Sequence, residues 1–247
     1  MLLVSCMPDA CPNPFAILFD LDNTLIASSM SQHEMWAAAL DQTGMLDGKS
    51  ADKDQVVDSL LNASRSFWSE PVRHRDGRMN IPVARRKIAE NGLAPFAELG
   101  ASAGDVVGDM HGVLHEQTTD LLPRALETLV HFRERGVHLA LVTNGTSDIQ
   151  RAKVEKFDLE RYVDHLQIEG EFGIGKPMPA AYHIALRALG ARAEESWMVG
   201  DNLEWEVTVP QQLGMHTVWR DPHGKGLPEG SAVRPDKIVL NVAELIA

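Results

Sequence analysis

Cysteine is the residue type that this sequence most nearly lacks. The 247 residues include two cysteines, Cys6 and Cys11, both near the N-terminus. Two cysteines exclude a disulfide framework and a cysteine-rich zinc site. Such a composition fits a reducing compartment, and we expect a cytoplasmic protein.

Positive charge is also scarce. The chain has 23 Lys and Arg against 35 Asp and Glu, a formal net charge of −12 at pH 7. A nucleic-acid-binding surface needs a basic face, so no nucleic-acid partner is expected. An anionic substrate would have to be bound by local positive charge, because the overall field repels it.

Long apolar runs are missing as well. No run approaches the roughly 18–20 residues that span a bilayer, so no membrane partner is expected. The N-terminal residues lack the basic start and the apolar region of about 7–15 residues of a secretory signal. We expect residues 1–14 to form a disordered leader. The sequence leaves open whether the protein is a monomer or a homodimer.

The first distinctive stretch that is present lies at residues 15–25. Residues 15–19 are apolar and predict a short buried strand, which ends at Asp20 and Asp22. Residues two apart on an extended chain point to the same side, so both acids would face one spot. Ligands bind at the carboxyl edge of open α/β sheets. A polar turn at the end of a strand is the alternative interpretation of this pair alone.

The remaining pattern separates two regions. Residues 27–120 show four amphipathic helices, with a loop marked by Pro71 and Gly77 between the second and the third. From residue 121 onward, strand and helix patterns alternate, which predicts a parallel sheet with right-handed crossovers. We therefore expect a core from residues 15–26 and 121–247, with residues 27–120 as a separate helical domain.

Four short motifs occur in a familiar order. Residues 20–24 (DLDNT) resemble the first motif of the haloacid dehalogenase superfamily. Residues 139–145 (LALVTNG), 175–177 (GKP) and 197–206 (WMVGDNLEWE) resemble its second, third and fourth motifs. The resemblance implies an α/β fold, with a Rossmann-like parallel sheet as its core and an inserted all-helical, four-helix cap domain.

The resemblance also implies catalytic roles. Asp20 would be the nucleophile that forms an aspartyl-phosphate, and Asp22 the general acid and base. Thr143 and Lys176 complete the catalytic set, and Lys176 would neutralise Asp20. The phosphoryl group would be bound by Thr143, Lys176 and the backbone N–H groups of Asn144 and Gly145.

A metal site follows from the same motifs. The resemblance implies that Asp20, the backbone carbonyl of Asp22 and Asp201 would form an oxygen ligand set, which suits Mg²⁺. Many relatives have an Asp where this chain has Glu206. The longer Glu206 side chain, or Glu204 in its place, would support the metal site.

Basic residues concentrate in one part of the helical region. Arg78 in the loop and Arg85 at the start of the next helix are candidates for holding an anionic group of the substrate. A solvated basic face is the alternative interpretation.

The motifs together predict a Mg²⁺-dependent phosphatase, a phosphoric monoester hydrolase. Its substrate would be a small phosphorylated metabolite such as a sugar phosphate, a nucleotide or a small acid phosphate. Three alternatives remain open: a phosphomutase, a 2-haloacid dehalogenase of the same fold, and a non-catalytic phosphate-binding protein. Dehalogenases need no metal and lack the second acid, so Asp22 and Thr24 argue against that alternative.

Overall fold

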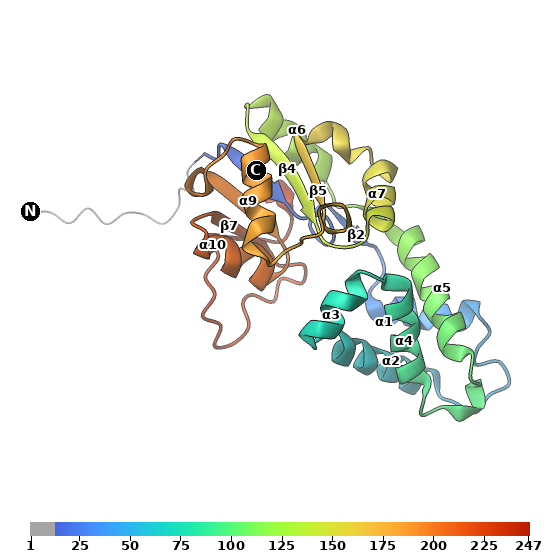
Figure 1. Ribbon diagram of the computed structural model, residues 1–247. Coiled ribbons are helices and arrows are strands. Elements are labelled where there is room, and N and C mark those ends of the chain that lie inside the picture. The colour runs from blue at the N-terminus through green and yellow to red at the C-terminus, as the bar shows by residue number, and fades with distance from the viewer. Residues whose placement is uncertain (1–12) are drawn as a thin grey trace, which may run out of the picture. The chain divides into compact units, whose positions relative to one another are not determined.

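The computed structural model describes residues 13–247. Residues 1–12 of the predicted leader lie outside the described residues. The chain divides into two compact units (Figure 1). The core unit consists of residues 13–26 together with 121–247, and the helical unit of residues 27–120. A two-stranded ribbon of β2 (Ile26–Ser28) and β3 (Thr119–Leu121) carries both chain crossings between the units.

Six parallel strands form the sheet of the core unit, in the order β5-β4-β1-β6-β7-β8. This sheet confirms the predicted α/β, Rossmann-like fold. The strands are β1 (Ala16–Phe19), β4 (His138–Thr143), β5 (His165–Ile168), β6 (Ser196–Gly200), β7 (His216–Arg220) and β8 (Lys237–Val239).

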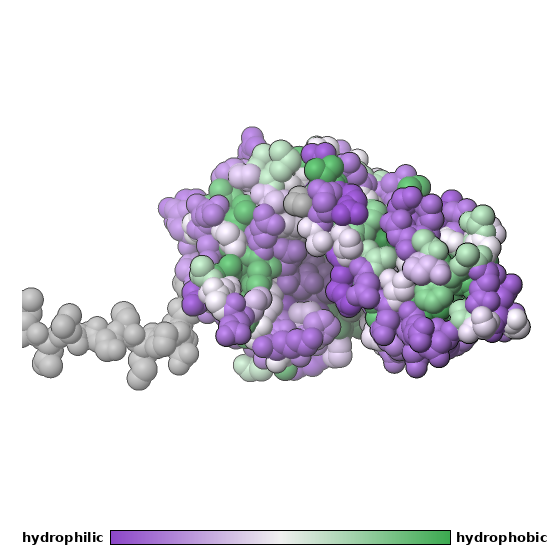
Figure 2. Space-filling view, turned by 90° about the horizontal axis from the view of Figure 1, so that it is seen from below, coloured by the Kyte–Doolittle hydropathy of each residue, from purple (hydrophilic) through white to green (hydrophobic). Residues whose placement is uncertain are grey.

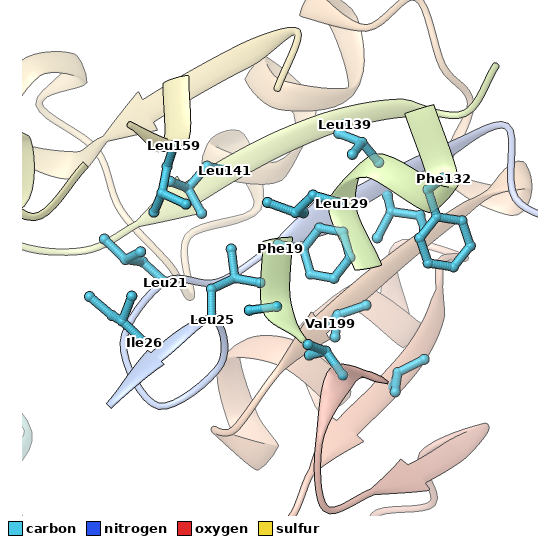
Figure 3. Packing of buried hydrophobic residues seen from close by; sticks show 14 of the residues in the cluster. Phe19, Leu21, Leu25, Ile26, Leu129, Phe132, Leu139, Leu141, Leu159 and Val199 are labelled. Atoms are coloured by element: carbon cyan, nitrogen blue, oxygen red, sulfur yellow. The ribbon is translucent and has the colours of Figure 1, made fainter. Parts of the chain in front are cut away.

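Strand β1 is buried on both faces, which explains its unbroken apolar sequence. Ile17 and Phe19 point into one apolar cluster, where Leu129 and Phe132 of the helix α6 (Ala125–Glu134) cover the sheet (Figure 3). Ala16 and Leu18 point into a second cluster, which the helix α9 (Pro179–Ala188) covers with residues that include Tyr182. The core unit therefore has a helix layer on each side of its central strand.

Three further helices of the core unit lie between its strands along the chain. They are α7 (Ser147–Lys156), α8 (Glu169–Phe172) and α10 (Val209–Gln212). A π-helical turn, Leu203–Thr208, leads into α10. Pro210 lies at the start of α10, where its missing N–H removes no helical hydrogen bond.

The helical unit contains five α-helices, so the prediction of four was incomplete. They are α1 (Gln32–Gln42), α2 (Lys53–Trp68), α3 (Pro71–Arg78), α4 (Ile81–Leu93) and α5 (Ala103–Thr118). Helix α3 replaces the loop expected around Pro71 and Gly77. The first turn tolerates proline, and the Glu70 carboxylate caps the helix by accepting from the N–H groups of Val72 and Arg73 at 3.1 and 2.8 Å.

Gly77 allows α3 to pack closely on α2. A Cβ atom at Gly77 would lie 2.7 Å from a ring carbon of Phe67. The glycine that indicated a loop is therefore required by packing.

On the face shown in Figure 2, the surface is mostly hydrophilic with scattered apolar patches. No helix among residues 13–247 combines the length and the apolar character needed to cross a membrane.

Candidate active site

The carboxyl ends of the three central strands carry predicted site residues. Asp20 follows β1, Thr143 ends β4, and Asp201 follows β6. Strand β1 pairs in parallel with both β4 and β6. The carboxyl ends of parallel strands meet at one edge of the sheet, where ligands bind in open α/β folds. The structure therefore brings these three residues to the same edge.

A tight turn follows Asp20. The backbone N–H groups of residues 24–26 donate to the carbonyl of Leu21 at 3.0–3.3 Å. Asn23 adopts the left-handed conformation with a φ of 55°, which asparagine tolerates better than most residues. The turn brings the Thr24 hydroxyl back to Asp20, where it donates to Oδ2 at 3.1 Å.

Lys176 is the cation at the centre of the site, and its side chain is fully buried. Its Nζ lies 2.6 Å from Oδ1 of Asp20 and 2.8 Å from Oε1 of Glu206. Asn144 fixes the backbone of this lysine. The Asn144 Oδ1 accepts from the Lys176 N–H at 2.8 Å, and Nδ2 donates to the Lys176 carbonyl at 2.6 Å. The second and third motifs are thus joined through one amide side chain.

Glu206 reaches Lys176 from the π-helical turn after β6. Its side chain is buried, and its Oε2 accepts from the backbone N–H of Asn202 at 2.8 Å. Gly200 leaves the space for it, because a Cβ atom there would lie 2.1 Å from the Cγ of Glu206. Glu204 is exposed. Of the two glutamates considered from the sequence, Glu206 is the one in the buried cluster.

The cluster has more acidic groups than basic ones. Burial raises the pKa of Asp20, and the ammonium of Lys176 opposes this shift. Burial and the neighbouring charges of Asp20 and Glu206 raise the pKa of Asp201 to about 8. Burial raises the pKa of Glu206 to about 7, although Lys176 again acts in the opposite direction. Burial lowers the pKa of Lys176, but the two carboxylates outweigh burial and raise it above its usual range. A further positive charge would stabilise the ionised forms of all three acids.

The Asp22 carboxylate contacts helix α7. Lys153 donates from Nζ to Oδ1 and Oδ2 of Asp22 at 2.7 and 2.8 Å. Gln150 donates from Nε2 to Oδ2 at 3.0 Å, and the same Nε2 donates to Oγ1 of Thr143. Sequence reasoning missed both α7 residues. One feature of the sequence indicated Gln150: this polar residue lies on the same face of the helix as the apolar Val154, and both are buried.

The loop after β4 uses a carboxylate that the sequence did not indicate. Glu169, at the start of α8, accepts from the backbone N–H of Gly145 at 3.1 Å. Gly175 packs against the same group, since a Cβ atom there would lie 2.5 Å from Cδ of Glu169 and 2.6 Å from Oδ1 of Asn144. In this structure the Gly145 N–H therefore has a protein partner. Phosphate binding by Asn144 and Gly145 stays a prediction.

The two predicted substrate arginines belong to the helical unit. Arg78 ends α3 and Arg85 lies in the second turn of α4, and both side chains are half-buried. The guanidinium of Arg85 lies beside α5, because a Cβ atom at Gly112 would be 3.2 Å from its Nη1. Their predicted contact with a substrate stays a prediction.

Comparison with known proteins identifies the family. Residues 16–214 match the family described as haloacid dehalogenase-like hydrolase. The chain belongs to this family. The chain is 31% identical over 209 residues to a ribulose-1,5-bisphosphate 5-phosphatase of Halopiger xanaduensis, and this alignment covers 84% of each chain. It is 40% identical over 179 residues to a phosphoserine phosphatase of Thermus thermophilus, with 72% of this chain and 65% of that protein covered.

A solved structure of the family has the same fold. The HAD hydrolase YfnB of Bacillus subtilis, solved with bound magnesium, superposes with a TM-score of 0.70 at 19% identity. The match covers 93% of this chain and 96% of that one. Together these findings confirm the predicted superfamily, the fold and the enzyme class of phosphoric monoester hydrolase.

Proposed function

We propose that this protein is a Mg²⁺-dependent phosphatase that hydrolyses a small phosphorylated metabolite through an aspartyl-phosphate on Asp20. The observation that carries the proposal is the environment of Asp20. Its Oδ1 contacts the buried ammonium of Lys176, and its Oδ2 accepts from Thr24, at the carboxyl edge of the sheet. A carboxylate held in one orientation is prepared to act as a nucleophile.

The reaction has two steps in this proposal. First, an oxygen of Asp20 attacks phosphorus, the bond to the leaving oxygen breaks, and Asp22 protonates that oxygen. Second, Asp22 takes a proton from a water molecule that attacks the same phosphorus, which releases phosphate and regenerates Asp20. The hydroxyl of Thr143, the ammonium of Lys176 and the backbone near Asn144 would hold the phosphoryl oxygens.

The residues also fit a divalent cation. The carboxylates of Asp20 and Glu206 contact the ammonium of Lys176, and the Asp201 carboxyl interacts with it electrostatically. The cluster therefore favours additional positive charge. Asp20, Asp201 and the Asp22 carbonyl would hold Mg²⁺ through oxygen, the ligand type that it prefers. Bound Mg²⁺ would neutralise charge on the transferring phosphoryl group.

Glu206 would support this site through Lys176 and the Asn202 N–H that it already contacts. Among residues 13–247, no three His, Cys, Asp or Glu side chains converge as a set of metal ligands. The proposed set contains two such side chains and one backbone carbonyl.

Two observations favour a small metabolite with a second anionic group as the substrate: the names of two relatives, and the arginines of the helical unit. The two curated relatives are named for a sugar bisphosphate and for phosphoserine, which are both small and carry a second anionic group. We propose that Arg78 and Arg85 hold such a group. Changing either to alanine should lower kcat/KM for the matching metabolite about 10- to 100-fold and should spare p-nitrophenyl phosphate.

A phosphate-release screen over phosphorylated metabolites tests the proposal, with Mg²⁺ and with EDTA. We expect release that needs Mg²⁺ and disappears in Asp20→Asn, because an amide is not a nucleophile towards phosphorus. Chloride release from a 2-haloacid would support the dehalogenase alternative, and transfer of phosphate between positions would support the mutase. Tight binding of phosphate esters without turnover would indicate a binding protein.

A further inference from the structure

We propose that Gln150 is a positioning residue that orients both Asp22 and Thr143, with Lys153 as its partner. This inference rests on the proposed phosphatase function, because it acts through two residues of that mechanism. All four residues, Gln150, Lys153, Asp22 and Thr143, belong to the core unit.

The amide of Gln150 has a defined orientation. The residue is buried with 2% exposure on α7. Its Nε2 donates to Oδ2 of Asp22 at 3.0 Å and to Oγ1 of Thr143, and its Oε1 accepts from Nζ of Lys153 at 2.8 Å. A flipped amide would place the NH₂ group against an ammonium, which is also a donor. The contact with Lys153 therefore fixes which end of the amide faces the site.

The hydrogen bond from Gln150 determines where the hydroxyl proton of Thr143 points. A threonine hydroxyl has one proton to donate and can accept at its lone pairs. Because Oγ1 of Thr143 accepts from Gln150, its own proton is directed away from that amide. The proton is then available for a phosphoryl oxygen at the carboxyl edge of the sheet.

The consequence for Asp22 concerns its carboxylate rotamer. Nζ of Lys153 contacts both of its oxygens at 2.7 and 2.8 Å, and Gln150 adds a third hydrogen bond. An ammonium on a flexible stem acts as a point charge and selects no particular plane for a carboxylate. The fixed amide of Gln150 supplies that selection. A general acid must lie within hydrogen-bond reach of the leaving oxygen, so its orientation affects the rate.

The position itself argues for a polar role. Gln150 shares the buried face of α7 with Val154, and a buried amide is costly unless its hydrogen bonds are satisfied. The loop after β4 is fitted to this side chain. Gly145 has a φ of +126°, and a Cβ atom there would lie 3.3 Å from Cγ of Gln150.

Leaving-group dependence is the measurement that separates positioning from a structural role. Gln150→Met keeps the length of the side chain and removes the donors. We expect kcat/KM for an alkyl phosphate to fall about 10- to 100-fold, the usual loss for a charge-assisted hydrogen bond. The loss for p-nitrophenyl phosphate should be several-fold smaller, because nitrophenolate leaves with little need of a proton. The inhibition constant of inorganic phosphate should rise about 10-fold through Thr143.

Two further variants test the same two readouts. Lys153→Met removes the contact that fixes the amide of Gln150, so it should reproduce the leaving-group effect and also raise the inhibition constant of phosphate, by a smaller factor than Gln150→Met. Gln150→Glu keeps the size and replaces the donor with an acceptor that faces the Asp22 carboxylate, so it should be at least as damaging as Gln150→Met. If Gln150→Met fails to fold, Gln150→Glu provides the same two readouts.

Gln167→Met is the matched control. Gln167 is a buried amide on β5 whose Nε2 donates to the carbonyl of Ala181 at 2.9 Å. Its loss should leave the substrate ratio and the phosphate inhibition constant unchanged. Equal losses on both substrates in the Gln150 variants, with unchanged phosphate inhibition, would overturn the positioning role. A wild-type protein that releases no phosphate from any ester would instead overturn the proposed function, and this assignment with it.

Discussion

The two units bury polar side chains in different ways. The core unit buries an ionic cluster, in which Lys176 lies between the carboxylates of Asp20 and Glu206. In the helical unit, the buried ring of His111 stacks on Trp36 with ring centroids 3.9 Å apart. The Nδ1 of His111 and the Nε1 of Trp36 have no hydrogen-bond partner among the described residues.

The difference shows what burial demands of each group. A buried charge requires a counter-charge, and Lys176 supplies it for the acids of the core unit. Among residues 13–247, the side chain that contacts the His111 ring nitrogen is the neutral amide of Gln32, at 3.2 Å from Nε2, so the ring remains neutral. Burial, together with the positive charges of Arg85 and His115, lowers the pKa of His111 to about 3. The core unit therefore keeps charges that can do chemistry, whereas the helical unit buries a neutral pair.

The largest expected effect on stability comes from removing the shared cation. Lys176→Met would leave Asp20 and Glu206 buried without a counter-charge. We expect the free energy of unfolding to fall by about 3–5 kcal/mol, measured by urea denaturation at pH 7. A loss of less than about 1 kcal/mol is what an exposed ion pair would give. It would mean that buried charge does not distinguish the core unit from the helical unit.

A surface ion pair of the helical unit is the control for that change. Arg86 donates to both carboxylate oxygens of Asp109 at 2.6 and 2.9 Å, but both side chains are exposed. Solvent screens such pairs. Arg86→Met should leave the urea midpoint nearly unchanged.

The next effect is the acid sensitivity caused by His111. Its folded pKa lies below its unfolded value of 6.5, so the unfolded chain binds the extra proton below that pH. Stability is then present above pH 6.5 and is lost as the pH falls towards 3. Between pH 7 and pH 5 the loss should be about 2 kcal/mol. The difference between wild type and His111→Gln at each pH isolates this contribution. Parallel pH profiles would show that His111 takes up a proton in the folded protein.

The smallest effect concerns two glycines on α5, one turn apart. A Cβ atom at Gly108 would lie 2.8 Å from the Cα of Arg86 on α4, whereas at Gly112 it would meet only the end of the flexible Arg85 side chain. Alanine favours a helix by about 1 kcal/mol over glycine. Overpacking against backbone costs about 1–3 kcal/mol. Gly108→Ala should therefore destabilise the protein by roughly 1 kcal/mol, and Gly112→Ala should not. Equal urea midpoints for the two variants would contradict close packing of α4 on α5.

The sequence predicted the features that depend on short-range patterns. The apolar run at residues 15–19 and the strand–helix alternation led to the observed parallel sheet, because strands buried on both faces are continuously apolar. The rule that ligands bind at the carboxyl edge then placed Asp20, Thr143 and Asp201 together. None of these inferences required knowledge of tertiary contacts.

The features that were missed depend on tertiary contacts. Helix α3 was hidden because Gly77 serves packing against Phe67 and not a turn. Gln150 and Lys153 lie about 130 residues from Asp22 along the chain, and nothing in their own helix points to it. The sequence could not decide between Glu204 and Glu206. Both lie in the π-helical turn, and the geometry of that turn determines which of the two side chains faces Lys176.

In the proposed mechanism Asp20 carries the phosphoryl group during turnover. A single turnover with a reactive phosphate ester, stopped with acid and analysed by peptide mass spectrometry, tests this step. We expect one added phosphoryl group on the peptide that contains Asp20. It should be absent in Asp20→Asn and increased in Asp22→Asn, where hydrolysis of the intermediate is slowed. Continued phosphate release by Asp20→Asn, with no phosphorylated peptide in the wild type, would contradict it.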